Sequence, residues 1–216
     1  MTPPSRIEAK ICGLSTPETV DAAVAAGAQY VGFVTFPASP RHVASVEALR
    51  VLGSRVPASV VRVGLFVDPD DALLDARLAS GAIDLLQLHG RETPQRLAEI
   101  RARTGKPVMK AIKVAAATDV ETGIAAYAPV ADRLMFDAAE GTLPGGNATA
   151  FDWTFLAGRR VPKPWFLAGG LNVGNVAEAV RVTGAPAVDV SSGVEASRGV
   201  KSADLIRAFL DTVKAL

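Results

Sequence analysis

The chain has 216 residues, of which 49% are hydrophobic and 21% are charged, a composition typical of a folded globular protein. Its 23 basic and 22 acidic residues give a formal charge of +1, which argues against a long-range field that attracts nucleic acid or an anionic membrane surface. A chain of this length can bury one core without disulfides or metal, and we expect residues 1–216 to form a single domain.

Short apolar runs recur along the whole chain and predict β-strands. Each run is too short for a typical helix and is rich in Val, Ile, Leu or Phe. Apolar residues on both faces of a run are typical of parallel strands that helices cover. In chain order, the predicted strands span residues 6–11, 29–34, 60–66, 84–88, 108–113, 133–136, 165–168 and 187–190.

The segments between these runs carry the start and stop signals of helices. A threonine or aspartate directly before a proline predicts a helix start, because its side-chain oxygen can accept from an early backbone N–H. A glycine after the helical pattern predicts the end, since glycine adopts the left-handed conformation easily. The expected starts are at Thr16, Asp68 and Thr93, and the expected ends are at Gly27, Gly81, Gly105 and Gly184.

The repeated strand–helix unit determines the predicted fold class. Eight such units can close into a (β/α)8 TIM barrel, in which no strand edge stays exposed. A doubly wound open sheet is the alternative, but it typically has about five to seven strands and a glycine-rich first turn. The first turn here, residues 12–15, reads Cys-Gly-Leu-Ser and lacks that motif. We therefore predict an α/β protein with a single (β/α)8 barrel.

The N-terminus and the cysteine content bear on the cellular location. Cys12 is the only cysteine, so an internal disulfide is impossible, which fits a reducing compartment. Residues 1–10 carry three charged side chains and lack the apolar run of a signal peptide. No stretch approaches the roughly 18 apolar residues that span a bilayer. We expect a cytoplasmic protein without a membrane partner.

Polar residues gather where the predicted strands end, and barrels of this kind hold their active sites at those ends. The pattern therefore predicts an enzyme. The candidate residues at the strand ends are Cys12, Arg41, Gln87, His89, Lys110, Lys113, Asp137, Gly169, Gly170, Asp189, Ser191, Ser192 and Gly193.

The loops after the last two predicted strands favour a phosphate site. Gly169 and Gly170 follow one strand, and Ser192 and Gly193 follow the next. Glycine lets backbone N–H groups approach an anion closely, and the positive end of a following helix would add to the attraction. Barrels of this class often bind phosphate at these two loops. The alternative is that these glycines only form turns.

Cys12 and Asp137 are the candidates for proton transfer. They directly follow the first and sixth predicted strands, so a substrate across the barrel mouth can meet both. One can remove a proton while the other supplies one. As a base the cysteine must be a thiolate, and as an acid the aspartate must hold a proton. The alternatives are a buried structural cysteine and an aspartate that caps a helix.

The remaining candidates leave other chemistries open. Arg41 can pair with a carboxylate or a phosphate in a forked geometry, unless it is a solvated loop residue. Lys113 can form a Schiff base, and we expect Lys110 and Lys113 to face the same side of their strand. The only histidines are His42 and His89, and their spacing matches no zinc motif, so we expect no metal site.

A set of ordered segments resembles the phosphoribosylanthranilate isomerase family. Each motif alone is common, but the set keeps its order over almost the whole chain, which makes the resemblance specific. The matching segments are Lys10-Ile11-Cys12-Gly13-Leu14, Gly32-Phe33-Val34, Pro37-Ala38-Ser39-Pro40-Arg41, Val63-Gly64-Leu65-Phe66-Val67, Leu86-Gln87-Leu88-His89-Gly90, Phe136-Asp137, Phe151-Asp152-Trp153, Ala168-Gly169-Gly170-Leu171-Asn172 and Asp189-Val190-Ser191-Ser192-Gly193-Val194-Glu195.

The resemblance implies an isomerase of tryptophan biosynthesis that uses acid–base chemistry with no cofactor or metal. The family converts N-(5-phosphoribosyl)anthranilate into 1-(2-carboxyphenylamino)-1-deoxyribulose 5-phosphate by an Amadori rearrangement. By resemblance, Asp137 protonates the ring oxygen of the sugar and Cys12 removes the proton from C2. The residues implied to bind substrate are Arg41 for the anthranilate carboxylate, backbone amides around Gly169, Gly170, Ser192 and Gly193 for the phosphate, and Gln87, His89 and Asp189 as further pocket residues.

One loop departs from the family pattern. Residues 145–150 read Gly-Gly-Asn-Ala-Thr-Ala, where the family usually has Gly-Gly-Ser/Thr-Gly. Loss of the last glycine would stiffen this loop or change the backbone donors that it offers. Two alternative functions stay open: another isomerase or epimerase of phosphosugars, and a phosphate-binding barrel without catalysis. The only partner implied is a small phosphorylated substrate, with no obligatory protein partner.

Overall fold

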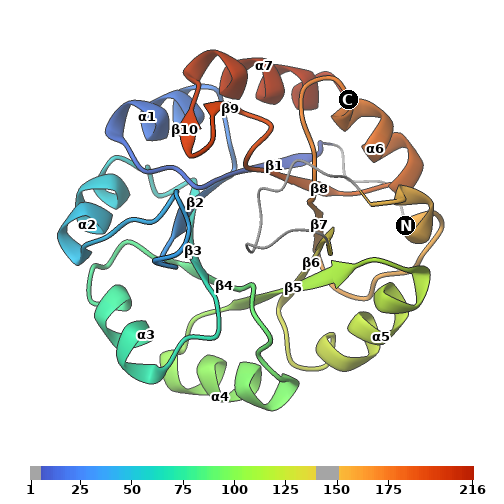
Figure 1. The fold of residues 1–216 in the computed structure, drawn as a ribbon, viewed down its shortest axis with the longest axis horizontal. Coiled ribbons are helices and arrows are strands. Elements are labelled where there is room, and N and C mark those ends of the chain that lie inside the picture. Colours follow the sequence, from blue (N-terminus) through green and yellow to red (C-terminus); the bar gives the residue numbers. More distant parts are fainter. Residues whose placement is uncertain (1–5, 140–150) are drawn as a thin grey trace.

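Eight parallel strands, β1 to β8, pair in chain order in the computed structural model, which describes residues 6–139 and 151–216. β1 also pairs with β8, so the sheet closes on itself. Figure 1 shows this ring of strands inside a ring of helices. The predicted (β/α)8 barrel is confirmed, and the open doubly wound sheet is excluded.

Each observed strand overlaps one of the predicted runs. β6 extends beyond the predicted end at residue 136, so Asp137 belongs to the strand itself and its orientation is set by the sheet. The strands are β1 (Glu8–Cys12), β2 (Tyr30–Val34), β3 (Val61–Phe66), β4 (Leu85–Leu88), β5 (Val108–Val114), β6 (Arg133–Ala138), β7 (Trp165–Leu167) and β8 (Ala187–Val190).

The helices that cover the barrel begin and end largely as the sequence indicates. Thr16 and Thr93 accept hydrogen bonds from the N–H groups three residues later, as predicted. Gly105 and Gly184 end their helices in the left-handed conformation. The helices are α1 (Pro17–Ala25), α2 (Val46–Ser54), α3 (Asp71–Leu78), α4 (Pro94–Thr104), α5 (Ala117–Tyr127), α6 (Val176–Thr183) and α7 (Ala203–Lys214).

The predicted start at Asp68 is wrong. The cap of α3 is Asp70, whose carboxylate accepts from the N–H of Leu73 at 2.7 Å. Asp68 has a positive φ of 45° and lies in the turn after β3, where its own N–H donates to Glu92. A short polar side chain tolerates this left-handed conformation, so Asp68 forms the turn and leaves the cap to Asp70.

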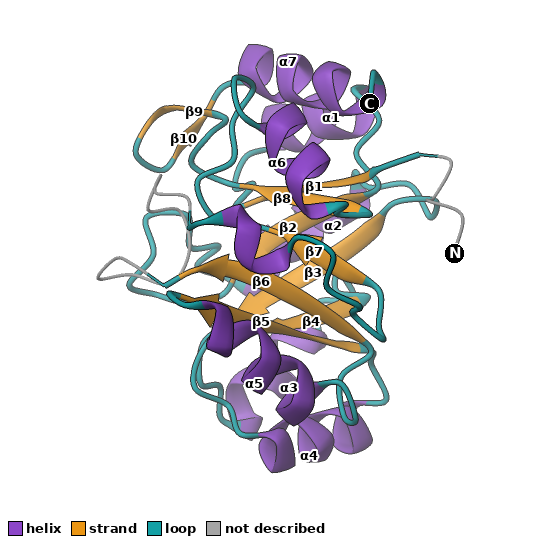
Figure 2. Cartoon of the chain, turned by 90° about the vertical axis from the view of Figure 1, so that its right-hand side faces the viewer, coloured by secondary structure: helices purple, strands orange, loops and turns teal. Residues whose placement is uncertain are grey.

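Two of the eight units differ from a simple strand–helix repeat. Between β6 and β7, the described residues contain only the 3₁₀ helix η1 (Trp153–Leu156). After β8 the chain forms a hairpin of β9 (Glu195–Ser197) and β10 (Val200–Lys201) before α7 begins. Figure 2 shows this hairpin at the end of the barrel toward which the arrowhead of β6 points.

Side chains on the strands alternate between two cores. Those that face outward pack against the helices in one large apolar cluster, which includes Ile11, Val31 and Phe136. Those that face the barrel axis form a second cluster, which includes Tyr30 and Phe166 with their rings in edge-to-face contact. The barrel is therefore filled from within and leaves a pocket at one end. None of the described helices is long and apolar enough to cross a bilayer.

Candidate active site

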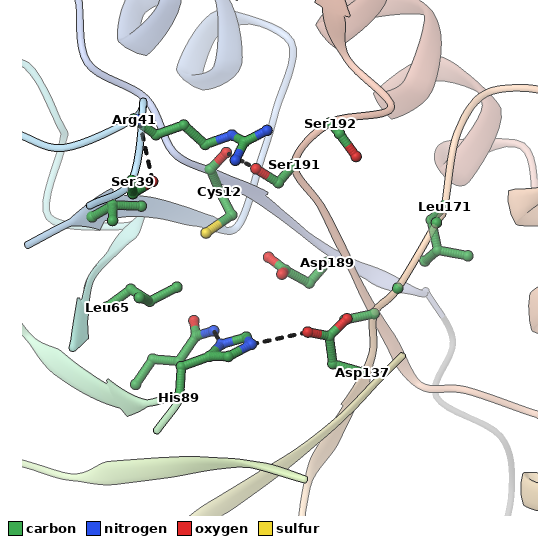
Figure 3. Close-up of a pocket in the computed structure, with 15 residues that line it drawn as sticks. Cys12, Ser39, Arg41, Leu65, His89, Asp137, Leu171, Asp189, Ser191 and Ser192 are labelled. Atoms are coloured by element: carbon green, nitrogen blue, oxygen red, sulfur yellow. Dashed lines mark hydrogen bonds and ion pairs between the residues drawn. The ribbon is translucent and has the colours of Figure 1, made fainter. Parts of the chain in front are cut away.

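The inward-facing positions at the carboxyl ends of the strands carry polar side chains, and these line one pocket. Cys12 on β1 and Asp189 on β8 come from paired neighbouring strands, and Asp137 on β6 comes from farther round the barrel. Figure 3 shows their side chains around a common space together with His89. The predicted site residues that line this pocket are Cys12, Arg41, Gln87, His89, Asp137, Gly169, Gly170, Asp189, Ser191 and Ser192.

Asp137 is held by two neighbouring side chains. The Lys113 ammonium on β5 donates to Oδ2 of Asp137 at 2.6 Å. Nε2 of His89 lies 2.9 Å from the same oxygen. The amide nitrogen of Gln87 lies 2.9 Å from Nδ1 of His89, and the Lys113 ammonium lies 3.0 Å from Nε2, so both ring nitrogens have polar neighbours.

These contacts decide the charge state of the cluster. Burial by itself raises the pKa of Asp137, but the His89 hydrogen bond and the Lys113 charge outweigh it and hold that pKa well below its ordinary value. Burial also lowers the pKa of His89, against the pull of Asp137 in the other direction. The free protein therefore holds a neutral His89 beside an ionised Asp137 at neutral pH.

Cys12 lies across the pocket and is 4% exposed. Burial raises the pKa of its thiol, while the nearby Lys10 ammonium opposes that rise. The hydroxyl of Ser191, which also lines the pocket, donates to the backbone carbonyl of Cys12 at 3.2 Å. The thiol is thus buried away from solvent, with the Lys10 ammonium nearby.

Arg41 is a buried residue of an ion-pair network and not a solvated loop residue. Its Nε and Nη2 donate to the two carboxylate oxygens of Glu195 at 2.6 and 2.8 Å. Lys201 donates to the same carboxylate at 2.8 Å and to the backbone carbonyl of Ser191. Burial by itself raises the pKa of Glu195. The Arg41 hydrogen bond and the Lys201 charge outweigh this effect and lower the pKa to about 2.

The two glycine loops meet at the edge of the pocket. Gly169 and Gly170 have φ values of 85° and 67°, which glycine adopts without strain. Asn172 and Gly193 form a parallel bridge between the loops, and a methyl group on Gly193 would overlap the carbonyl oxygen of Leu171. The expectation of a helix directly after each loop holds only for α6, because the second loop leads into the β9–β10 hairpin.

Residues 9–212 match the family model described as N-(5'phosphoribosyl)anthranilate (PRA) isomerase. The chain belongs to this family. A relative named N-(5'-phosphoribosyl)anthranilate isomerase, from Paracoccus denitrificans, is 56% identical over 207 residues, which cover 94% of this chain and 95% of that protein. A relative with the same name from Parvibaculum lavamentivorans is 56% identical and covers 96% of this chain and 98% of that protein.

Solved structures with the family name share the fold. The crystal structure of phosphoribosyl anthranilate isomerase from Thermotoga maritima has a TM-score of 0.87 at 34% identity and covers 97% of this chain and 100% of that chain. A second structure, in complex with reduced 1-(o-carboxyphenylamino)-1-deoxyribulose 5-phosphate, has a TM-score of 0.82 at 33% identity, with coverage of 97% and 100%.

Lys113, which the sequence presents as a possible Schiff-base lysine, contacts two residues of the pocket, Asp137 and His89. The expectation that Lys110 faces the same side is wrong, because residues three apart on a strand face opposite sides. Lys110 points out of the barrel and donates to Glu92 at 2.6 Å. The alternation of side chains between the two faces of β5 is the signal in the sequence that places Lys110 and Lys113 on opposite faces.

Two further predictions concern residues at the margin of the pocket. Gly193 does not line it but spaces the loops that do. The loop of residues 145–150, which departs from the family pattern, lies outside the described residues. Within residues 6–139 and 151–216, no three His, Cys, Asp or Glu side chains group together as metal ligands.

Proposed function

We propose that this chain catalyses the Amadori rearrangement of N-(5-phosphoribosyl)anthranilate to 1-(2-carboxyphenylamino)-1-deoxyribulose 5-phosphate in tryptophan biosynthesis. Membership of the isomerase family supports the reaction class. The observation that carries the mechanism is that Cys12 and Asp137 line one pocket from different sides, beside two glycine loops. Because a phosphorylated substrate does not cross bilayers unaided, we place the reaction in the cytoplasm.

In the first step, Asp137 gives a proton to the ring oxygen of the sugar, and the C–O bond at C1 breaks to leave an open-chain Schiff base. Asp137 must first gain that proton. The substrate brings a phosphate and a carboxylate into the pocket, and nearby negative charge raises the pKa of a carboxylic acid. His89 and Lys113 keep the carboxyl group oriented while it changes its protonation state.

In the second step, the Cys12 thiolate removes the proton from C2 of the open sugar. The electron pair of that C–H bond forms the C1–C2 double bond of an enolamine, and the Schiff-base nitrogen becomes neutral. The enolamine then tautomerises to the ketone. Cys12 and Asp137 approach the sugar from β1 and β6, which allows each to act on a different atom of it.

Substrate binding is assigned to the edges of the same pocket. Backbone amides of Gly169, Gly170, Ser192 and Gly193 bind the phosphate, supported by the bridge that joins their loops. Arg41 binds the anthranilate carboxylate. Since its Nε and Nη2 already bind Glu195, we expect the carboxylate to meet the Nη1 edge.

The test of this function is the fluorescence-monitored consumption of phosphoribosylanthranilate by purified protein without added metal. We expect turnover by the wild type. Cys12→Ser and Asp137→Asn should each lower kcat by about 10²- to 10⁴-fold, because each removes one proton-transfer group. Both variants should still bind a phosphorylated product analogue.

The outcomes separate the alternatives. A wild type that binds the analogue without turnover would be a phosphate-binding barrel that lacks catalysis. Equal rates in the wild type and both variants would remove Cys12 and Asp137 as the acid–base pair.

A further inference from the structure

Lys10 is a fully buried cation with no part in the mechanism above. It precedes Cys12 by two residues on β1, so both side chains face the barrel axis. Its ammonium donates to Oδ1 of Asp189 on β8 at 2.7 Å, and both side chains are almost completely shielded from solvent. A buried ion pair costs desolvation energy and adds little net stability, so its presence at this point calls for another reason.

The Lys10 ammonium and the Cys12 thiol both lie close to Gly32 on β2. A methyl group at Gly32 would lie 3.0 Å from Nζ of Lys10 and 3.1 Å from Sγ of Cys12. The ammonium and the thiol therefore border the same small space above a residue that has no side chain. Cys12 and Gly32 are also direct partners in the β1–β2 register, which fixes this arrangement in the sheet.

We propose that Lys10 is a positioning residue, anchored by Asp189 and accommodated by Gly32, that holds the Cys12 thiolate in the barrel for proton abstraction. This inference rests on the proposed function of Cys12 as the base. Asp189 acts here through Lys10, because its carboxylate fixes the ammonium against β1.

Among the charged groups around Cys12, Lys10 is the main one that favours its thiolate. On its own strand the thiol meets Lys10, and from β8 it meets Asp189, whose negative charge disfavours a thiolate. Lys201 on β10 contributes a further, smaller effect of positive charge. Arg41 also lines the pocket, but its charge is balanced by Glu195. Across the pocket, Asp137 is ionised and His89 neutral, so neither stabilises a second negative charge.

The test uses the fact that Cys12 is the only cysteine of the chain. Ultraviolet thiolate absorbance followed against pH reports this one group, with Cys12→Ser as the blank. In Lys10→Met the thiol should titrate at higher pH than in the wild type, by about one pH unit or more, which reduces the thiolate fraction near neutral pH about tenfold. The pH profile of kcat/KM should move in the same direction.

Three further variants separate positioning from stability. Lys10→Met with Asp189→Asn leaves no unpaired buried charge, and its thiol should still titrate above the wild type. Gly32→Ala keeps every charge but places a methyl group against both the ammonium and the thiol, which displaces them slightly, and it should shift the titration in the same sense. Lys110→Met breaks an equally buried pair with Glu92 on the outer face of β5, and its thiol should titrate as in the wild type.

A Lys10→Met protein, or the double variant, whose thiol titrates as in the wild type would overturn the inference. A shift of the same size in the thiol titration of Lys110→Met would also overturn it, since the loss of any buried ion pair in the barrel would then explain the effect. The titration needs no substrate, so it is independent of the isomerase assay. A wild type without isomerase activity would instead refute the proposed function.

Discussion

Three polar groups hold the two carboxylate oxygens of Asp137. Lys113 and His89 both contact Oδ2, while Oδ1 accepts from the backbone N–H of Ala138 at 3.0 Å. Such a carboxylate is well oriented but ionised at neutral pH. Its use as an acid therefore depends on an anionic substrate that changes the local charge.

His89→Ala should lower kcat about 10- to 100-fold with a smaller change in KM, because Asp137 loses one of the two side chains that orient it. Steady-state kinetics on phosphoribosylanthranilate measure both constants. The same change made in Asp137→Asn should cost little more, since the group that His89 positions is already gone. Additive losses in the double variant would show that His89 acts independently of Asp137.

At the scale of elements, two loops from neighbouring units form one wall of the pocket. The loop after β7 and the loop after β8 are joined by the bridge between Asn172 and Gly193. Contact between the loops is so close that only a glycine fits at position 193, against the carbonyl of Leu171. The spacing of the backbone amides on both loops depends on this one contact.

Gly193→Ala should raise KM for the phosphorylated substrate about tenfold or more, because the methyl group forces the loops apart and misplaces the proposed phosphate donors. Gly184→Ala is the matched control. Gly184 ends α6 with a φ of 67° and has open space around it, so alanine there strains the backbone away from the pocket. The control should lose stability in urea while KM stays near the wild-type value. A KM unchanged in Gly193→Ala would exclude this loop contact from substrate binding.

At the scale of the whole molecule, buried ion pairs join parts of the chain that are distant in sequence. Lys10 and Asp189 connect the first strand to the last, across the closure of the barrel. Arg41, Glu195 and Lys201 connect the loop after β2 to the β9–β10 hairpin. These ion pairs hold the pocket residues in place and also stabilise the folded barrel. Because the paired groups are ionisable, we expect both the geometry of the pocket and the stability of the chain to depend on pH.

Glu195 gives a measurable part of that dependence. Its pKa falls from 4.5 to about 2 on folding, so the ionised group stabilises the fold above about pH 4.5 and loses this effect as pH falls towards 2. We expect the contribution to be about 2 kcal/mol after allowance for screening by solvent. Glu195→Gln should therefore be less stable than the wild type at neutral pH, with a difference that shrinks in acid.

Urea unfolding at neutral pH and near pH 3 measures this difference. Glu47→Gln, which removes an exposed ion pair with Arg50, should match the wild type at both pH values. A stability gap for Glu195→Gln that is the same at both pH values would contradict the assignment of this charge.

Local patterns in the sequence were sufficient to predict strands and helix ends, because these depend on interactions between residues that are close in the chain. Apolar runs identified all eight strands, and side-chain caps and glycines identified most helix ends. The prediction failed at Asp68, where a second aspartate two residues later caps α3 instead. It also failed for Lys110 and Lys113, although the two-residue period of a strand distinguishes them.

The sequence by itself determined the barrel, its strand order and the residue types at the strand ends, because periodicity, capping and turn formation depend on near neighbours. Only the tertiary structure decided which of those residues meet. Glu195 is 154 positions from Arg41, and Asp189 is 179 positions from Lys10. Charge states follow from such contacts and from burial, and both exist only once β8 has closed against β1.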